Sequence, residues 1–119
     1  LKTLYRYNPA VNVWYDQPAF PGDARNITQT FVINGLAYAG GGEIINNQGS
    51  SLGIPGDFYQ YNPQNYTWKK VADFPLADKH KYRAFSINSR GYVPYSNGTP
   101  TQYMYKYTPL SCIVGGTTP

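Results

Sequence analysis

His80 is the only histidine of the chain, and it lies in the basic run of residues 78–83. The only cysteine, Cys112, stands far from it, close to the C-terminal end. A zinc site needs about four ligands, and a nucleophilic side chain needs a base beside it, so one histidine and one remote cysteine support neither. We therefore predict that His80 is solvated, that the chain holds no metal or other cofactor, and that these residues contain no catalytic constellation.

The cations on either side of His80 are the next candidates. Lys79, Lys81 and Arg83 alternate along a predicted strand and share one face, whereas His80 and Tyr82 point to the other. Single-stranded nucleic acid is bound where aromatic rings and cations share a surface. The pattern argues against nucleic acid and favours a solvated basic face, which is also a candidate surface for a partner.

The composition indicates which elements position these residues. The 119 residues include 13 Tyr, 12 Gly and 10 Pro, with 41% hydrophobic and 13% charged residues. Aromatic residues suit pleated sheets, and Gly and Pro mark turns, so we predict an all-β protein rather than a helical bundle or a disordered tail. Every apolar run is far shorter than the roughly 20 residues that cross a bilayer, so we expect no transmembrane segment.

The charges are distributed unevenly along the chain. Residues 1–67 carry a formal charge of −1, and residues 68–119 carry +5. The basic second half is therefore suited to attract an acidic partner.

An internal repeat organises the chain. The series Tyr-X-Tyr-Asn-Pro followed by Trp14 begins at Tyr5 and returns 54 residues later at Tyr59, followed by Trp68. A partial third copy begins at Tyr105, only 46 residues after the second. The shortening falls in one connection, because residues 43–56 form a long Asn-, Gly- and Ser-rich loop and residues 96–101 form its short counterpart.

Each period is predicted to hold four strands joined by turns. Asn34-Gly35 is a hairpin signal because both residues accept positive φ, and its counterpart Asn88-Ser89 is a weaker one. The expected strands are residues 3–8, 12–17, 27–33, 36–41, 57–62, 66–72, 82–88, 90–95 and 103–108.

The unit resembles the kelch repeat, a four-stranded blade of a β-propeller with a period of about 50 residues. The elements that carry the resemblance are an apolar strand, an aromatic residue, a glycine doublet, a Tyr-Asn-Pro turn, a tryptophan and a Phe-Pro pair, here residues 31–33, Tyr38, Gly40-Gly41, residues 61–63, Trp68 and Phe74-Pro75. The doublet is expected to let backbones crowd where blades converge. Pro94-Tyr95 replaces it in the second unit.

The resemblance implies an all-β, incomplete ring of kelch-type β-propeller blades built as four-stranded antiparallel meanders. We expect blades over residues 1–109, divided into a partial blade 1–20, a blade 24–75 and a partial blade 79–109, with residues 110–119 as a tail or linker. Propellers typically close with about four to eight blades. The chain is therefore expected to be part of a larger propeller, or a subunit that closes a ring by association.

Two kinds of kelch enzyme come with the resemblance. Copper oxidases of the galactose-oxidase type need two His, two Tyr and a Cys gathered around copper, whereas this chain has one His and one Cys in its tail. Sialic-acid mutarotases use charged residues around the central channel, where Arg25, Glu43 or Arg83 could lie. Arg25 more simply matches the basic residue that commonly follows the Phe-Pro pair, with Lys79 as its repeat equivalent, so a structural or surface role is favoured.

Three sequons, at Asn26, Asn65 and Asn97, lie at predicted turns. With the low charge content they make the chain similar to secreted or cell-surface kelch proteins, including bacterial, outer-membrane-associated ones. The sequons are compatible with secretion in a eukaryote and uninformative in a bacterium.

The function expected from these residues is a non-catalytic module for protein–protein or surface interactions. The candidate surface is the long loop with its three apolar residues, together with the basic strand start: Ile44, Ile45, Leu52, Lys79, Lys81 and Arg83. Alternatively, the three apolar residues pack back onto the blade edge. The alternative function is part of a kelch enzyme acting on carbohydrate, with its site formed largely by other blades.

Overall fold

The protein is all-β in the computed structural model, which describes residues 2–26, 28–75, 83–96 and 102–109. No helix occurs in these ranges. The strands are β1 (Leu4–Asn8), β2 (Val13–Gln17), β3 (Gln29–Ile33), β4 (Leu36–Gly40), β5 (Ile44–Ile45), β6 (Ser51–Gly53), β7 (Phe58–Asn62), β8 (Thr67–Val71), β9 (Phe85–Ile87), β10 (Arg90–Ser96) and β11 (Gln102–Tyr107).

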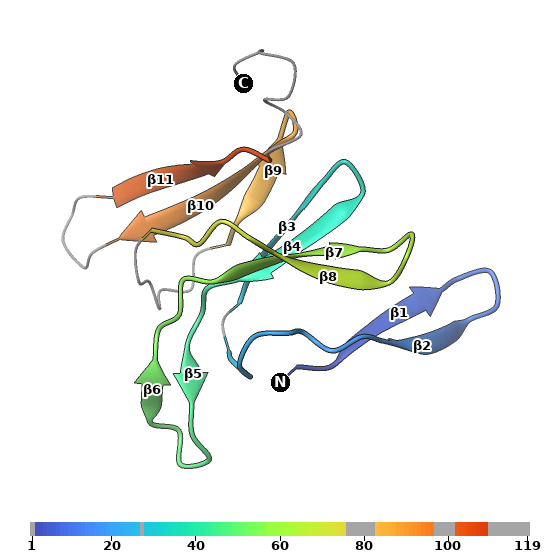
Figure 1. Cartoon of the computed structure of the whole chain (residues 1–119), viewed down its shortest axis with the longest axis horizontal. Coiled ribbons are helices and arrows are strands. Elements are labelled where there is room, and N and C mark those ends of the chain that lie inside the picture. The colour runs from blue at the N-terminus through green and yellow to red at the C-terminus, as the bar shows by residue number, and fades with distance from the viewer. Residues whose placement is uncertain (1, 27, 76–82, 97–101, 110–119) are drawn as a thin grey trace.

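The described strands form four antiparallel sheets, of which β5–β6 is a hairpin between β4 and β7 and the other three follow one another along the chain (Figure 1). The strand pair β1–β2 comes first, the four-stranded sheet β3-β4-β7-β8 second, and the three-stranded sheet β9-β10-β11 third. The middle sheet is the four-stranded antiparallel meander predicted from the repeat. The three sheets form successive blades of a ring that does not close.

The turns at one end of the sheets repeat with the sequence. Asn34 and Gly35 have φ values of 50° and 79°, and Asn88 and Ser89 have φ values of 51° and 62°. Both pairs therefore have positive φ at both central residues, as a type I′ hairpin requires. Ser89 takes this conformation although serine signals it less clearly than glycine.

The Tyr-Asn-Pro turns also match. In β7–β8 the side-chain oxygen of Asn62 accepts a hydrogen bond from the Gln64 amide at 2.9 Å, and Tyr66 has a φ of 58°. In β1–β2 the Asn8 side chain accepts from the Ala10 amide at 3.0 Å. The side chain of asparagine thus closes each turn against its own backbone.

The main core lies between the middle and third sheets. Phe31, Ile33, Tyr38 and Phe58 of the middle sheet and Val93 of β10 are buried together. Tyr38 is only 1% exposed, and its ring stacks on Phe31 with centroids 5.1 Å apart. Alternate residues of β3 and β4 therefore point into one interface, as the two-residue period of a strand requires.

A second aromatic contact joins the N-terminal strand pair to the middle sheet. Phe20 packs edge-on against Tyr59 with centroids 5.2 Å apart, and Trp68 donates its indole hydrogen to the Pro18 carbonyl at 2.8 Å. The same edge-on contact recurs in the next repeat between Phe74 and Tyr105, also at 5.2 Å. Each linker after a sheet's last strand is thus anchored on the following sheet.

The glycine doublet has a different role from the one expected. A Cβ at Gly40 would lie 2.3 Å from the carbonyl oxygen of Asp57, so the crowding occurs inside one blade, between β4 and the chain that enters β7, and not between blades. Gly41 and Gly42 have φ values of 63° and 81° and end β4. At the repeat position Pro94 continues the strand, and β10 runs on to Ser96.

Candidate functional site

Three connections meet at the end of the sheets opposite the turns. Because the middle sheet is an antiparallel meander, the start of β3, the end of β4, the start of β7 and the end of β8 share this end. We call it the loop end. It receives the linker from β2 to β3, the long connection from β4 to β7 and the chain leaving β8.

The long connection, predicted as a loop, contains a β-hairpin that the sequence did not indicate. Ile44 pairs with Gly53 and Ile45 with Ser51, and the hairpin extends away from the middle sheet (Figure 1). The Asn46 side chain accepts the amides of Gln48 and Ser50 at 2.9 Å each, which stabilises the tip.

The three apolar candidates have unequal exposure. Ile44 and Ile45 are half-buried, whereas Leu52 is 66% exposed. The exposed leucine side chain on the extended hairpin is available to a partner.

Arg25 lies at the base of the loop end in a buried ion pair. It binds both carboxylate oxygens of Asp57, the second from Nη2 at 3.1 Å. Its Nε donates to the Asp23 carbonyl at 2.9 Å, and its guanidinium carbon lies 4.9 Å from the centre of the Phe20 ring. Since Arg25 is 5% exposed and its donors are engaged, it joins the linker to β7, in agreement with a structural role.

The ion pair shifts the pKa of Asp57. Hydrogen bonding from Arg25, reinforced by its positive charge, lowers the pKa of Asp57 below the ordinary value of 3.8, although partial burial opposes the shift. Asp57 was not singled out from the sequence. Its repeat counterpart is Thr3, so the repeat contains no signal for the acid.

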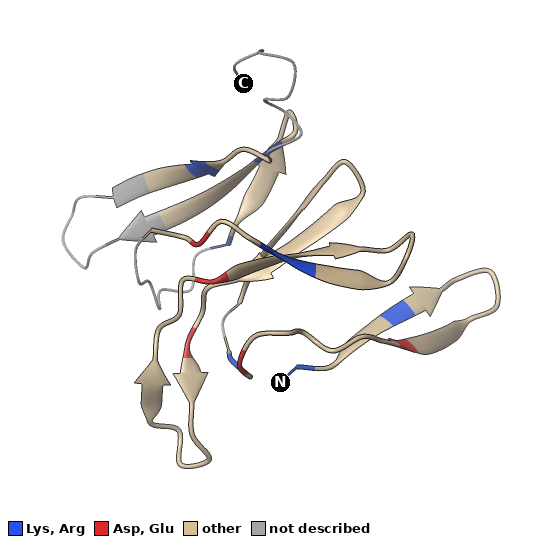
Figure 2. Cartoon of the chain, in the orientation of Figure 1, with Lys and Arg blue, Asp and Glu red and all other residues tan. Residues whose placement is uncertain are grey.

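Glu43 and the residue that follows Arg83 both bond to the chain that leads into β3. Glu43 forms a backbone bridge with Asn26, whose amide donates to the Glu43 carbonyl at 2.8 Å. The residue after Arg83, Ala84, donates its amide to the Gln29 side chain at 2.9 Å. Glu43 is half-buried and Arg83 is exposed. Figure 2 shows acidic residues where the chain enters β5 and β7.

Several predicted features lie outside the described residues. These are His80, the cations Lys79 and Lys81, and the sequon at Asn97. The other two sequon asparagines, Asn26 and Asn65, are exposed.

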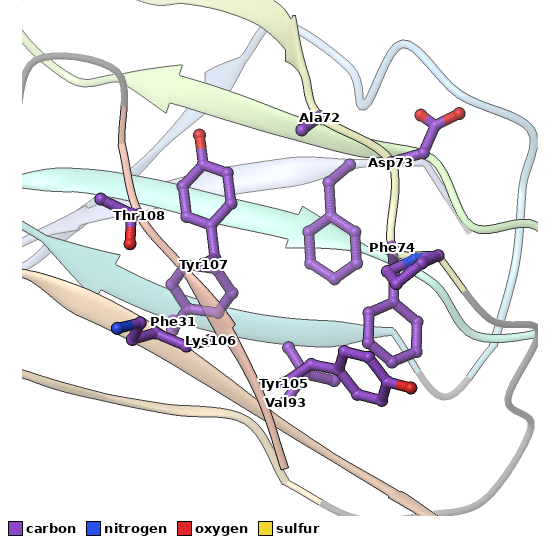
Figure 3. A pocket seen from close by; sticks show the side chains of 11 residues that line it. Phe31, Ala72, Asp73, Phe74, Val93, Tyr105, Lys106, Tyr107 and Thr108 are labelled. Carbon is purple, nitrogen blue, oxygen red and sulfur yellow. The ribbon is translucent and has the colours of Figure 1, made fainter. Parts of the chain in front are cut away.

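A groove of about 300 Å³ lies between the end of β8 and β11 (Figure 3). The rings of Phe74, Tyr105 and Tyr107 stand around it. One repeat earlier, the equivalent position is filled by Trp68, which contacts Phe20, the counterpart of Phe74, with centroids 5.5 Å apart. The groove therefore corresponds to a packing position between blades.

Within the described ranges, no three His, Cys, Asp or Glu residues gather closely enough to hold a metal ion. Those ranges also contain no long apolar helix that could cross a membrane.

The comparisons with known proteins point to one fold. No family model matches the sequence. The chain is 34% identical over 58 residues to an N-acetylneuraminate epimerase of Haemophilus influenzae (strain PittEE) and 36% identical over 58 residues to one of Salmonella typhi. Each match covers 49% of this chain, and the chain spans 15% of the length of these relatives.

A solved structure, "Structure of YjhT", matches 67% of this chain and 23% of its own, with a TM-score of 0.57 and 28% sequence identity. The 54-residue repeat, the four-stranded meander and these similarities agree. The described part of the chain therefore has the fold of an incomplete kelch-type β-propeller.

Proposed function

We propose that the loop end of this chain is part of a site that binds an acidic sugar, as in an N-acetylneuraminate epimerase. The observation that carries the proposal is the shared name of the matching relatives. It is supported by the position of Glu43 and Arg83 beside the start of β3. An enzyme role departs from the non-catalytic module expected from the residues alone.

The two side chains suit complementary tasks. N-acetylneuraminate carries a carboxylate, which an exposed guanidinium recognises through charge-assisted hydrogen bonds. Inversion at the anomeric carbon proceeds by ring opening: the anomeric hydroxyl loses a proton, the bond between the anomeric carbon and the ring oxygen breaks, and the ring oxygen gains a proton. Reclosure on the other face reverses these transfers, and a carboxylate such as Glu43 can move the protons. Arg25 is unsuited to the first task because Asp57 and a backbone carbonyl occupy its donors.

The test is a titration of the chain with N-acetylneuraminate, followed by NMR shifts of backbone amides. We expect shifts at residues 26–29, 43 and 83–84, and we expect the Arg83→Gln variant to bind about tenfold more weakly, as for one lost charge-assisted hydrogen bond. Arg90→Gln is the matched control, because Arg90 bonds the carbonyls of Asn88 and Ser89 at the turn end.

The methyl ester of N-acetylneuraminate separates carboxylate recognition from general sugar binding. We expect the ester to bind wild type and Arg83→Gln equally weakly. Equal affinity of the acid and the ester for the wild-type chain, or shifts confined to the turn end, would refute the proposal.

A second candidate function, the binding of a protein partner, is supported by the exposure of Leu52 on the β5–β6 hairpin. Deletion of residues 44–52 is expected to abolish a partner interaction in a pull-down and to leave the β circular-dichroism spectrum intact. Leu52→Ser should act similarly, whereas Val11→Ser, at an apolar position of the β1–β2 turn that is 56% exposed, should not. Unchanged binding after the deletion would exclude the hairpin.

A further inference from the structure

Arg25 and Asp57 join three segments of the loop end. Arg25 lies in the linker from β2 to β3, and 1% of its side chain is exposed. Its guanidinium binds both carboxylate oxygens of Asp57, where the chain enters β7, and its Nη1 also donates to the Gly41 carbonyl at 3.3 Å, where the chain leaves β4. Because the guanidinium is planar and rigid, these bonds fix the relative positions of the three segments. We call Arg25, Asp57 and Gly41 the clamp.

Backbone hydrogen bonds extend the clamp to Glu43. The Gly41 amide donates to the Asp57 carbonyl at 3.1 Å. Beside Arg25, the Asn26 amide donates to the Glu43 carbonyl at 2.8 Å, and the Glu43 amide donates to the Asn26 carbonyl at 3.0 Å. Both ends of the connection that carries the β5–β6 hairpin are therefore held at the linker, and the backbone of Glu43 is held with them.

The clamp is closely packed. A Cβ at Gly22 would lie 2.6 Å from Nη2 of Arg25, 2.7 Å from the Phe20 ring and 3.1 Å from Oδ2 of Asp57. These distances are shorter than ordinary contacts of about 3.5–4.0 Å. A methyl group at Gly22 would therefore push the two charged groups apart without removing either charge.

The third repeat unit has no acid at the position of Asp57. Its residue there, two positions before the repeated Tyr-X-Tyr, is Tyr103. The same unit has the short connection of residues 96–101 in place of the long one. The acid thus accompanies the long connection that bears Glu43. Since the third sheet forms with neither feature, the clamp serves the connection and not the sheet.

We propose that Arg25 and Asp57 are positioning residues that hold Glu43 at the loop end for the proton transfers of the proposed sugar site. They act through the backbone of Asn26 and Glu43 and not by contact with the sugar. Reacting groups need a fixed geometry, which buried residues behind a site supply through hydrogen bonds. The inference rests on the proposed function, in which Arg83 recognises the sugar carboxylate, and adds a separate device for the group that moves protons.

Amide hydrogen exchange of the full chain, without sugar, tests whether the clamp holds Glu43. Asp57→Asn keeps the size of the side chain and removes its charge. We expect the amides of Asn26 and Glu43 to exchange at least about tenfold faster, as for the loss of one hydrogen bond between charged groups. The amides that join β3 to β4 should keep their protection, because the opening is local.

Two further variants exclude other causes. Gly22→Ala leaves every charge in place and should release the same two amides by separating the ion pair. Asp73→Asn is the matched control, because it removes an acid from the exposed pair with Lys70, and it should leave both amides unchanged. Unchanged exchange of the two amides in the Asp57→Asn and Gly22→Ala chains would overturn the inference. So would equal acceleration along β3 and β4, since the clamp would then contribute only to overall stability.

A titration with N-acetylneuraminate separates the clamp from the sugar site. We expect the Asp57→Asn chain to keep its affinity and the amide shift at Ala84, because Arg83 still binds the carboxylate, and to lose the shift at Glu43. A Glu43 shift that survives in this variant, although its amide exchanges fast, would overturn the positioning role. Absence of any sugar-induced shift in the wild-type chain would refute the sugar site itself, whereas the exchange experiment would still decide whether the clamp holds Glu43.

Discussion

Gly91 in β10 lies close against the ring of Phe31 in the neighbouring blade, and Gly91→Ala measures that contact. A Cβ at this residue would lie 2.4, 2.6 and 2.8 Å from three atoms of the Phe31 ring. Carbon atoms in contact are normally about 3.5–4.0 Å apart, so the ring must withdraw by roughly 1 Å. The ring has little freedom to do so, because it is 6% exposed and stacked on Tyr38.

Overpacking of a filled core lowers the free energy of unfolding by about 1–3 kcal/mol. Because the Phe31 ring cannot easily move, we expect Gly91→Ala to lower it by about 2–3 kcal/mol. Urea denaturation followed by near-ultraviolet circular dichroism measures this loss. The matched control is Gly53→Ala, since Gly53 lies in β6 with open space around its Cβ position. The control should be neutral or stabilising by up to about 1 kcal/mol, because alanine reduces the freedom of the unfolded chain.

The double variant Gly91→Ala with Phe31→Leu tests whether the ring is the cause. A smaller, flexible side chain should absorb the methyl group, so the combined loss should be at least about 1 kcal/mol less than the sum of the two single losses. If Gly91→Ala is as harmless as Gly53→Ala, or if the two losses simply add, the proposed packing between the middle and third sheets is wrong.

Three further effects follow from the structure. Folding lowers the Asp57 pKa, so the ion pair with Arg25 contributes fully to the free energy of unfolding above the unfolded pKa of 3.8, and this contribution is lost as pH falls through the lower folded pKa. Acid denaturation should therefore be steeper for wild type than for Asp57→Asn. Tyr66→Asn should stabilise the protein by about 0.5–1 kcal/mol in thermal unfolding, because asparagine tolerates the φ of 58° and already occupies the repeat position. Trp68→Phe should cost about 1 kcal/mol or more in urea unfolding through the lost hydrogen bond to Pro18, and an unchanged midpoint would exclude that anchor.

The features that the sequence predicts correctly are those that depend on residue types within a few positions of one another. All nine predicted strands occur, with ends shifted by up to about three residues, because alternating apolar residues and turn signals act over a few positions. Asn34-Gly35 forms its hairpin turn because both residues accept positive φ. The β5–β6 hairpin was missed, because strands of two and three residues are too short to show alternation.

The sequence contains no comparable local signal for contacts between residues that are far apart along the chain. Arg25 was matched to its repeat position, but its partner Asp57 lies 32 residues away and has no acidic counterpart in the first unit. The close approach of Gly91 to Phe31 also depends on the packing of two sheets. Its repeat equivalent is Ala37, which lines a groove between the N-terminal strand pair and the middle sheet and has room for a methyl group.

The turn end of the blades repeats its backbone conformation from unit to unit, whereas the loop end does not. This difference indicates where the residues that determine function vary. At the turn end, Asn12 and Tyr66 share a positive φ, as do Asn34 and Asn88, so the same backbone is built at each copy. At the loop end, Gly40 is replaced by Pro94, and the hairpin-containing connection after β4 has only a short counterpart after β10. Sheet packing constrains the turns through strand register, whereas the loops contribute little to the core and tolerate change. Recognition by this chain is therefore expected at the loop end, and substitutions at the turn end should alter stability without altering what is bound.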